Sequence, residues 1–143
     1  MPAHRLGRSR ELLAARFGAE HVDLADLFLT RLRETVDRSP VSWEMALSAD
    51  AAPPGTKAGR ALQAWEAAAL PQVVAHVESV LADTSQAGRP VFLTGVAVLT
   101  RLGPLQAVAR WADLGARRSR AVWVGVPQAP GNIGPVLDGV PVP

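Results

Sequence analysis

Thr94 and Gly95 are the residues whose place in the sequence best suits ligand binding. They follow a short apolar run, Val91-Phe92-Leu93, and precede a helical pattern. Such a run is typical of a buried parallel strand, and α/β proteins bind ligands at the carboxyl ends of these strands. Backbone N–H groups opening the next helix can hold an anion, so a nucleotide or phosphate-ester site is one hypothesis. The competing interpretation is that Thr94 caps that helix, as Thr commonly does.

Other combinations of reactive residues have simpler structural explanations. The segment Gly55-Thr56-Lys57 contains the residues of a phosphate loop, but that loop needs Gly-Lys-Ser/Thr after a strand. Here the order differs and Pro53-Pro54 precedes it, so a turn and a helix cap explain the segment. A Ser-His-Asp set could combine His76 and Asp50 with either Ser42 or Ser48, but no nucleophile-elbow sequence supports it. We therefore assign no catalytic residue.

Metal and cofactor binding are not indicated by the sequence. The chain has no cysteine, and a metal site needs several converging ligands. The three histidines show no such spacing: His4, His21 and His76. We expect no metal ligand and no cofactor.

Arginine is the dominant basic residue, at fourteen of the fifteen basic positions. Arginine contacts phosphates in a bidentate manner, so binding of nucleic acid is a second hypothesis. However, the net charge is only +2, and nucleic-acid binders usually concentrate their charge more strongly. A GC-rich coding bias is the competing explanation. The candidate residues form two groups: Arg5, Arg8 and Arg10, and Arg117, Arg118 and Arg120.

Trp43 is the aromatic residue best placed to contact a partner. Trp65 and Trp111 lie on apolar helix stripes and Trp123 lies within an apolar run, so all three are expected in the core. Trp43 instead follows a residue suited to capping, Ser42. We therefore predict Trp43 as an interface residue.

Local signals predict the elements that must position these residues. Ser9, Asp23, Ser42 and Thr56 are suited to cap helices, Gly18 to end one, and Pro71 either kinks a helix or starts the next. An apolar alternation or run predicts strands. The predicted helices span 8–17, 24–37, 43–47, 57–82, 96–102 and 104–116; the predicted strands span 91–94 and 121–126, with 20–23 as a short strand or extended entry.

These elements predict an α/β fold, rich in helices, with a small parallel sheet of two or three strands. Residues 1–128 form one domain, with a helical part at 8–83 and a βαβ part at 89–126; a Pro/Gly-rich tail follows at 129–143. No apolar run approaches the roughly 20 residues of a membrane span, and the start of the chain lacks a secretory apolar segment. We expect a cytoplasmic protein without membrane contact.

Several segments together resemble a known group of proteins. They are SADAAPPGT at 48–56, RPVFLT at 89–94, AVWVGVPQ at 121–128 and GPVLDGVP at 134–141. This pattern resembles the C-terminal region of large proteins of bacterial phage-defence cassettes of the BREX/Pgl type, in the PglZ or ATPase-like component. The resemblance departs at 100–103, where an aromatic residue is expected and the chain reads Thr-Arg-Leu-Gly.

The resemblance implies a role in phage defence and a larger protein of a defence complex as partner. The phosphatase metal ligands and the ATPase phosphate loop of that group have no counterpart in this sequence, so no catalytic residue is transferred. The first hypothesis is therefore a non-catalytic protein-interaction module. The alternatives are a small nucleotide- or phosphate-ester-handling enzyme at Thr94-Gly95, and arginine-mediated binding of nucleic acid.

Overall fold

The structure is a computed structural model. It describes residues 3–103, 106–113, 115–126, 136–137 and 140–141, and side chains within these ranges from residue 7 to residue 126.

The centre of the fold is a parallel sheet of three strands in the order β1-β2-β3. The strands are β1 (Glu20–Asp23), β2 (Val91–Thr94) and β3 (Val122–Val124). Glu20 pairs with Val91, and Val91 pairs with Val122. The central strand β2 is buried along its whole length, as its unbroken apolar run predicted. The predicted parallel βαβ unit is present, and the segment at 20–23 adds a third strand at the edge.

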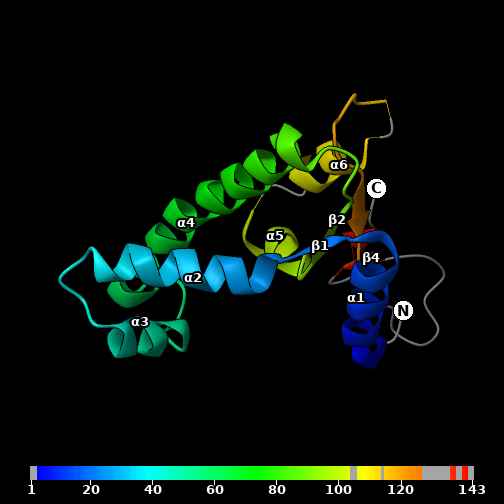
Figure 1. Cartoon of the computed structure of the whole chain (residues 1–143). Coiled ribbons are helices and arrows are strands. Elements are labelled where there is room, and N and C mark those ends of the chain that lie inside the picture. The colour runs from blue at the N-terminus through cyan, green and yellow to red at the C-terminus, as the bar shows by residue number, and fades with distance from the viewer. Residues whose placement is uncertain (1–2, 104–105, 114, 127–135, 138–139, 142–143) are drawn as a thin grey trace.

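The described residues include six helices, and Figure 1 shows that α3 lies away from the sheet, at the far end of α2 and α4. The helix-rich α/β class is thereby confirmed. The elements other than the sheet strands are α1 (Ala3–Phe17), α2 (Leu24–Asp37), α3 (Trp43–Asp50), α4 (Lys57–Ala82), a 3₁₀ turn (Thr84–Gln86), α5 (Ala97–Leu102), α6 (Gln106–Ala112), and an antiparallel pair, β4 (Val136–Leu137) and β5 (Val140–Pro141). Much of the predicted tail lies outside the described residues.

Three of the predicted helix caps are confirmed, and one is wrong. Asp23, Ser42 and Thr56 each accept a backbone N–H in the first turn of the next helix. Ser9 does not cap α1, because that helix begins at Ala3 and Ser9 lies inside it. Pro71 does not start a new helix, since α4 continues through it; α6 ends at Ala112, earlier than predicted.

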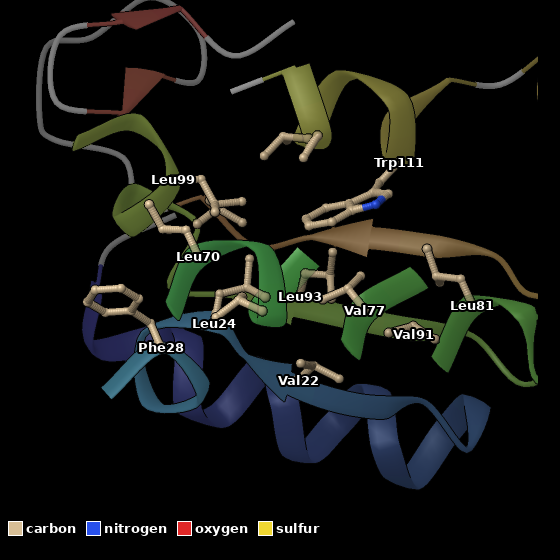
Figure 2. Packing of buried hydrophobic residues seen from close by; sticks show 14 of the residues in the cluster. Val22, Leu24, Phe28, Leu70, Val77, Leu81, Val91, Leu93, Leu99 and Trp111 are labelled. Atoms are coloured by element: carbon tan, nitrogen blue, oxygen red, sulfur yellow. The ribbon is translucent and has the colours of Figure 1, made fainter. Parts of the chain in front are cut away.

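The main core lies between one face of the sheet and helices α2, α4, α5 and α6 (Figure 2). Val22, Leu93 and Val91 point from the strands into this core, where they meet residues such as Val77 and Trp111. Each large apolar side chain buried in this way contributes about 1.5–3 kcal/mol to folding. Helices α2 and α4 pack along each other at the edge of the core. Both helices extend past the end of the sheet, and α3 packs against them there (Figure 1).

The other face of the sheet carries aromatic side chains. His21 lies against Phe92, with ring centroids 5.9 Å apart, and Trp123 meets Phe17 of α1 edge to face at 5.3 Å. Trp123 is half-buried and Phe17 is exposed. Of the tryptophans predicted in the core, Trp111 is fully buried and Trp65 is half-buried at the margin of the core. The prediction is wrong for Trp123, which is half-buried on the opposite face of the sheet against Phe17.

Candidate functional site

The carboxyl end of β2 brings Thr94 and Gly95 beside the start of α2, but Thr94 has a different role from capping. Its hydroxyl lies 2.8 Å from Nε2 of His21 on the neighbouring strand, and its side chain is buried. The N-cap position of α5 is Val96, without a side-chain cap hydrogen bond. The capping interpretation of Thr94 is therefore wrong, because the hydroxyl pairs across the sheet instead.

Gly95 is required by the close approach of β2 to α2. Its backbone is left-handed, with φ of 68°. A Cβ atom at this position would lie 2.6 Å from Oδ1 of Asp23 and 2.7 Å from the backbone nitrogen of Ala25. A side chain here would therefore both strain the backbone and collide with the first turn of α2.

The start of α2 already holds a negative group. The Asp23 carboxylate accepts the backbone N–H groups of Ala25, at 3.0 Å, and of Asp26, at 3.3 Å. A helix N-terminus attracts anions, and here its own sequence supplies one. An anionic ligand at Thr94-Gly95 would lie beside this carboxylate, which weakens the structural case for a phosphate site.

A groove opens next to Gly95. It has two adjoining lobes, of about 170 Å³ and about 490 Å³. The inner walls shared by both lobes come from α2, α3 and α4: Phe28, Leu29, Asp50 and Glu66. The smaller lobe extends along α3 past Trp43, and the larger one reaches Gly95 and α5. We call this feature the acidic groove.

Charge is distributed unequally along the acidic groove. Asp50 and Glu66 are the charged residues of the smaller lobe, whereas Arg101 joins them in the larger lobe. Burial, and then the nearby Asp50 carboxylate, raise the pKa of Glu66, while Arg101 acts in the opposite direction. Of the two nearby charges, the Asp50 carboxylate therefore acts on the pKa of Glu66 more strongly than the Arg101 guanidinium does.

The two groove carboxylates have no cation paired with them. Within the described ranges, neither forms an ion pair at 4.0 Å or less; the ion pairs found there are Arg31–Glu34, Arg110–Glu78 and Arg120–Glu20. Glu66 is half-buried, whereas Asp50 is exposed, so the loss of favourable solvation that accompanies burial applies to Glu66. Asp50 and Glu66 together therefore form a local negative site with apolar walls.

Trp43, the predicted interface residue, lies at the α3 end of the acidic groove. It is half-buried, and the Arg33 guanidinium stands 5.8 Å from the centre of its ring, a cation–π distance. Leu29 and Leu47 line the same lobe while remaining 52% and 54% exposed. Sequence reasoning missed these two leucines, although Leu29 lies off the apolar stripe of its helix and could have signalled an exposed apolar surface.

The arginines proposed for nucleic acid occupy unlike environments. Arg8, Arg10 and Arg117 are exposed, and the side chain of Arg5 lies outside the described residues. Arg118 donates to the backbone carbonyls of Arg110 and Trp111.

Arg120 is structurally committed and differs from its neighbours. It is 2% exposed, and its Nη2 lies 2.6 Å from Oε2 of Glu20. Its Nε and Nη1 donate to the carbonyls of Arg89 and Val80, both at 2.9 Å. Burial of its guanidinium leaves Arg120 without a surface that a nucleic acid could contact.

The described residues contain neither a cluster of metal ligands nor a helix able to span a membrane. Among them, no group of three or more His, Cys, Asp or Glu residues is placed to hold a metal ion. No helix in the described part of the chain is long and apolar enough to cross a membrane.

Comparison with known proteins gives a relative in a defence-related group. The chain is 33% identical over 135 residues to a protein of Streptomyces coelicolor named "Probable kinase PglW"; the match covers 94% of this chain and 9% of that protein. No family model and no solved structure matches the chain. The similarity is to a Pgl protein, as the resemblance predicted, but it does not support the predicted component, PglZ or the ATPase-like protein. The chain spans about one-tenth of this relative's length.

Proposed function

We propose that this chain is a non-catalytic interaction module of a bacterial phage-defence system of the Pgl/BREX type, acting in the cytoplasm by docking on a larger protein of that system. The observation that carries the proposal is the similarity to PglW along 94% of the chain. The matching part of PglW is a small fraction of a long protein. A segment of this size has the length of one domain. In PglW the matching segment is therefore one domain among several in the same protein.

The arrangement of polar and apolar groups supports docking over chemistry. At the strand ends, where an α/β enzyme would bind its substrate, the Thr94 hydroxyl and the Asp23 carboxylate are engaged in hydrogen bonds within the fold. Apolar side chains are exposed elsewhere, at Leu29, Leu47 and Met45. Clusters of exposed apolar residues rimmed by polar ones are typical of protein-binding surfaces.

The test is affinity purification of the tagged chain from its native host, with the recovered proteins identified by mass spectrometry. We expect one or two large proteins of the defence system in stoichiometric amounts. Phage protection should be lost when the coding segment is deleted and restored by the unchanged chain. Recovery of the chain alone as a folded monomer, together with unchanged protection, would overturn the proposal.

A second candidate function is nucleotide handling, because the relative is named a probable kinase. Its proposed site remains Thr94-Gly95. A ligand that binds the native state raises the melting temperature in proportion to the logarithm of its concentration. A dose-dependent rise with ATP and Mg²⁺ would favour this candidate over docking, and an unchanged melting curve would exclude it.

Three of the arginines proposed to bind nucleic acid are exposed and could contact phosphates: Arg8, Arg10 and Arg117. Phosphate contacts make such binding fall steeply with salt. Fluorescence anisotropy with labelled duplex DNA at low and at moderate salt therefore tests it, and no binding at low salt would exclude it.

A further inference from the structure

We propose that the acidic groove binds an apolar segment of a protein partner that carries a lysine or arginine side chain, and that this cation lies between Asp50 and Glu66. The inference rests on the proposed docking function and adds the surface and the chemistry of the partner. It is carried by the shape, the exposed apolar residues and the charge of the groove.

The walls of the acidic groove are suited to apolar contact. Leu29 on α2 and Leu47 on α3 are both more than half exposed, and Trp43 lines the smaller lobe with them. Helices α2, α3 and α4 supply these walls, and tertiary contacts hold the three helices together. A partner with apolar side chains on one face of a helix would cover this surface in the way amphipathic helices fill apolar grooves.

The size of the smaller lobe suits one side chain. Its volume is about 170 Å³, and an apolar cavity of about 150 Å³ accepts a group as large as benzene. A long side chain such as lysine or arginine can contact apolar walls along its methylene stem and place its charge at a polar tip. Asp50 and Glu66 are the charged residues in the lining of this lobe, so we place the charged tip beside them.

Charge selects the kind of partner. The lining of the smaller lobe contains two carboxylates and no basic residue. The nearest basic groups are outside that lining: the Arg33 guanidinium lies 5.8 Å from the Trp43 ring, and Arg101 lines the adjoining larger lobe. A phosphate-bearing ligand or a nucleic acid would be repelled in the smaller lobe, whereas a cation would gain two charge-assisted interactions. Complementary charge at an interface also excludes partners of the wrong sign. The combination of apolar walls with an unpaired acidic pair therefore favours a basic, apolar segment.

The first test uses a displayed library of random peptides selected on the immobilised, full-length chain. Enriched peptides should carry a lysine or arginine flanked by large apolar residues. Selection on the double variant Asp50→Asn, Glu66→Gln should lose the preference for the basic residue. The control variant Glu44→Gln removes an exposed carboxylate of α3 that lies outside the groove lining, and it should retain that preference.

A titration then measures the effect of charge. For the most enriched peptide, replacing its basic residue by Gln should weaken binding to the unchanged chain about tenfold, equivalent to about 1.4 kcal/mol. The same replacement should have little effect on binding to the double variant. The exposed-site variants Leu29→Ala and Leu47→Ala should weaken both peptides, and thermal melts confirm that each variant is folded.

Several outcomes would overturn this inference. They are enrichment without a basic residue, failure to enrich any peptide, and binding that Leu47→Ala and the double variant leave unchanged. Self-association of the chain that the groove variants abolish would assign the groove to a second copy. If the complex with a defence protein forms but survives all groove variants, the inference fails while the docking function stands; if no complex forms, the docking function itself fails.

Discussion

Arg120 and Glu20 lie one hundred positions apart in the chain, and their side chains meet at 2.6 Å from Nη2 to Oε2. The Arg120 side chain is 1% exposed, whereas that of Glu20 is 35% exposed. The same guanidinium donates to the carbonyls of Val80, in α4, and of Arg89, just before β2. One side chain therefore joins the edge strand β1, the end of the longest helix and the entry to the central strand.

The first prediction concerns the loss of this connection. Arg120→Met keeps much of the apolar stem but removes the guanidinium that donates to the carbonyls of Arg89 and Val80 and to the Glu20 carboxylate. We expect the free energy of unfolding to fall by about 2–4 kcal/mol, because buried polar groups without partners are destabilising. Urea denaturation followed by circular dichroism measures it. The control Arg117→Met, at an exposed arginine of the same run, should change stability by no more than about 0.5 kcal/mol; equal losses would refute the structural role of Arg120.

The second prediction separates backbone strain from collision at Gly95. Gly18 and Gly95 share a left-handed backbone, with φ of 63° and 68°. A Cβ at Gly18 meets no atom within 4 Å, whereas one at Gly95 meets Asp23 and Ala25. Gly18→Ala should therefore destabilise by about 1–2 kcal/mol, and Gly95→Ala by about 2–5 kcal/mol. If the two variants unfold at the same urea concentration, the close approach of Gly95 to the first turn of α2 is refuted.

The third prediction is a dependence of stability on pH through His21. Burial and the positive charge of Arg10 lower its pKa below the ordinary 6.5, while Asp23 acts in the opposite direction. The unfolded chain therefore binds this proton at a higher pH than the native state does. The contribution of neutral His21 to the free energy of unfolding is therefore complete above pH 6.5. It is lost as the pH falls from 6.5 through the pKa of His21 in the folded state. An NMR titration of the His21 ring should give a midpoint below 6.5, and a midpoint above it would contradict the arrangement.

The fourth prediction concerns Glu66, whose pKa is raised above 4.5, first by burial and then by Asp50. The native state holds this proton to a higher pH than the unfolded state, so stability is lost as the pH rises through the folded pKa. Glu66→Gln removes the charge with little change in helix propensity. We expect its melting temperature at neutral pH to exceed that of the unchanged chain by about 1–3 °C. This advantage should shrink as the pH falls towards 4.5; a variant that melts earlier at neutral pH would contradict an unpaired carboxylate in the groove.

The local structure of this chain could be predicted because its signals act over a few residues. Asp23, Ser42 and Thr56 each bond to a backbone nitrogen two or three positions ahead. The start of α1 was missed because Ser9 has the type of a capping residue but lies inside the helix. A capping residue marks a helix start only when the preceding residues do not continue the helix.

The candidate site depended on contacts that no short-range pattern contains. The acidic groove takes its lining from α2, α3, α4 and α5, so Asp50 and Glu66 become neighbours only after these helices have packed. Thr94 could cap a helix or pair across the sheet, and it pairs with His21, 73 positions away. The register of β1 beside β2 places His21 within hydrogen-bond distance of the Thr94 hydroxyl, and this determines the role of Thr94.

The sequence by itself determined the helix-rich α/β class, the buried strand β2 and the positions of most helices, because apolar periodicity and caps are local properties of the chain. The tertiary structure alone decided which of several similar residues became buried. Arg117, Arg118 and Arg120 are close in sequence and alike in chemistry, yet only Arg120 of these three meets the carboxylate of Glu20 and lies buried. A guanidinium can be withdrawn from water only where fixed acceptors surround it, and those acceptors come from three separate elements of the fold.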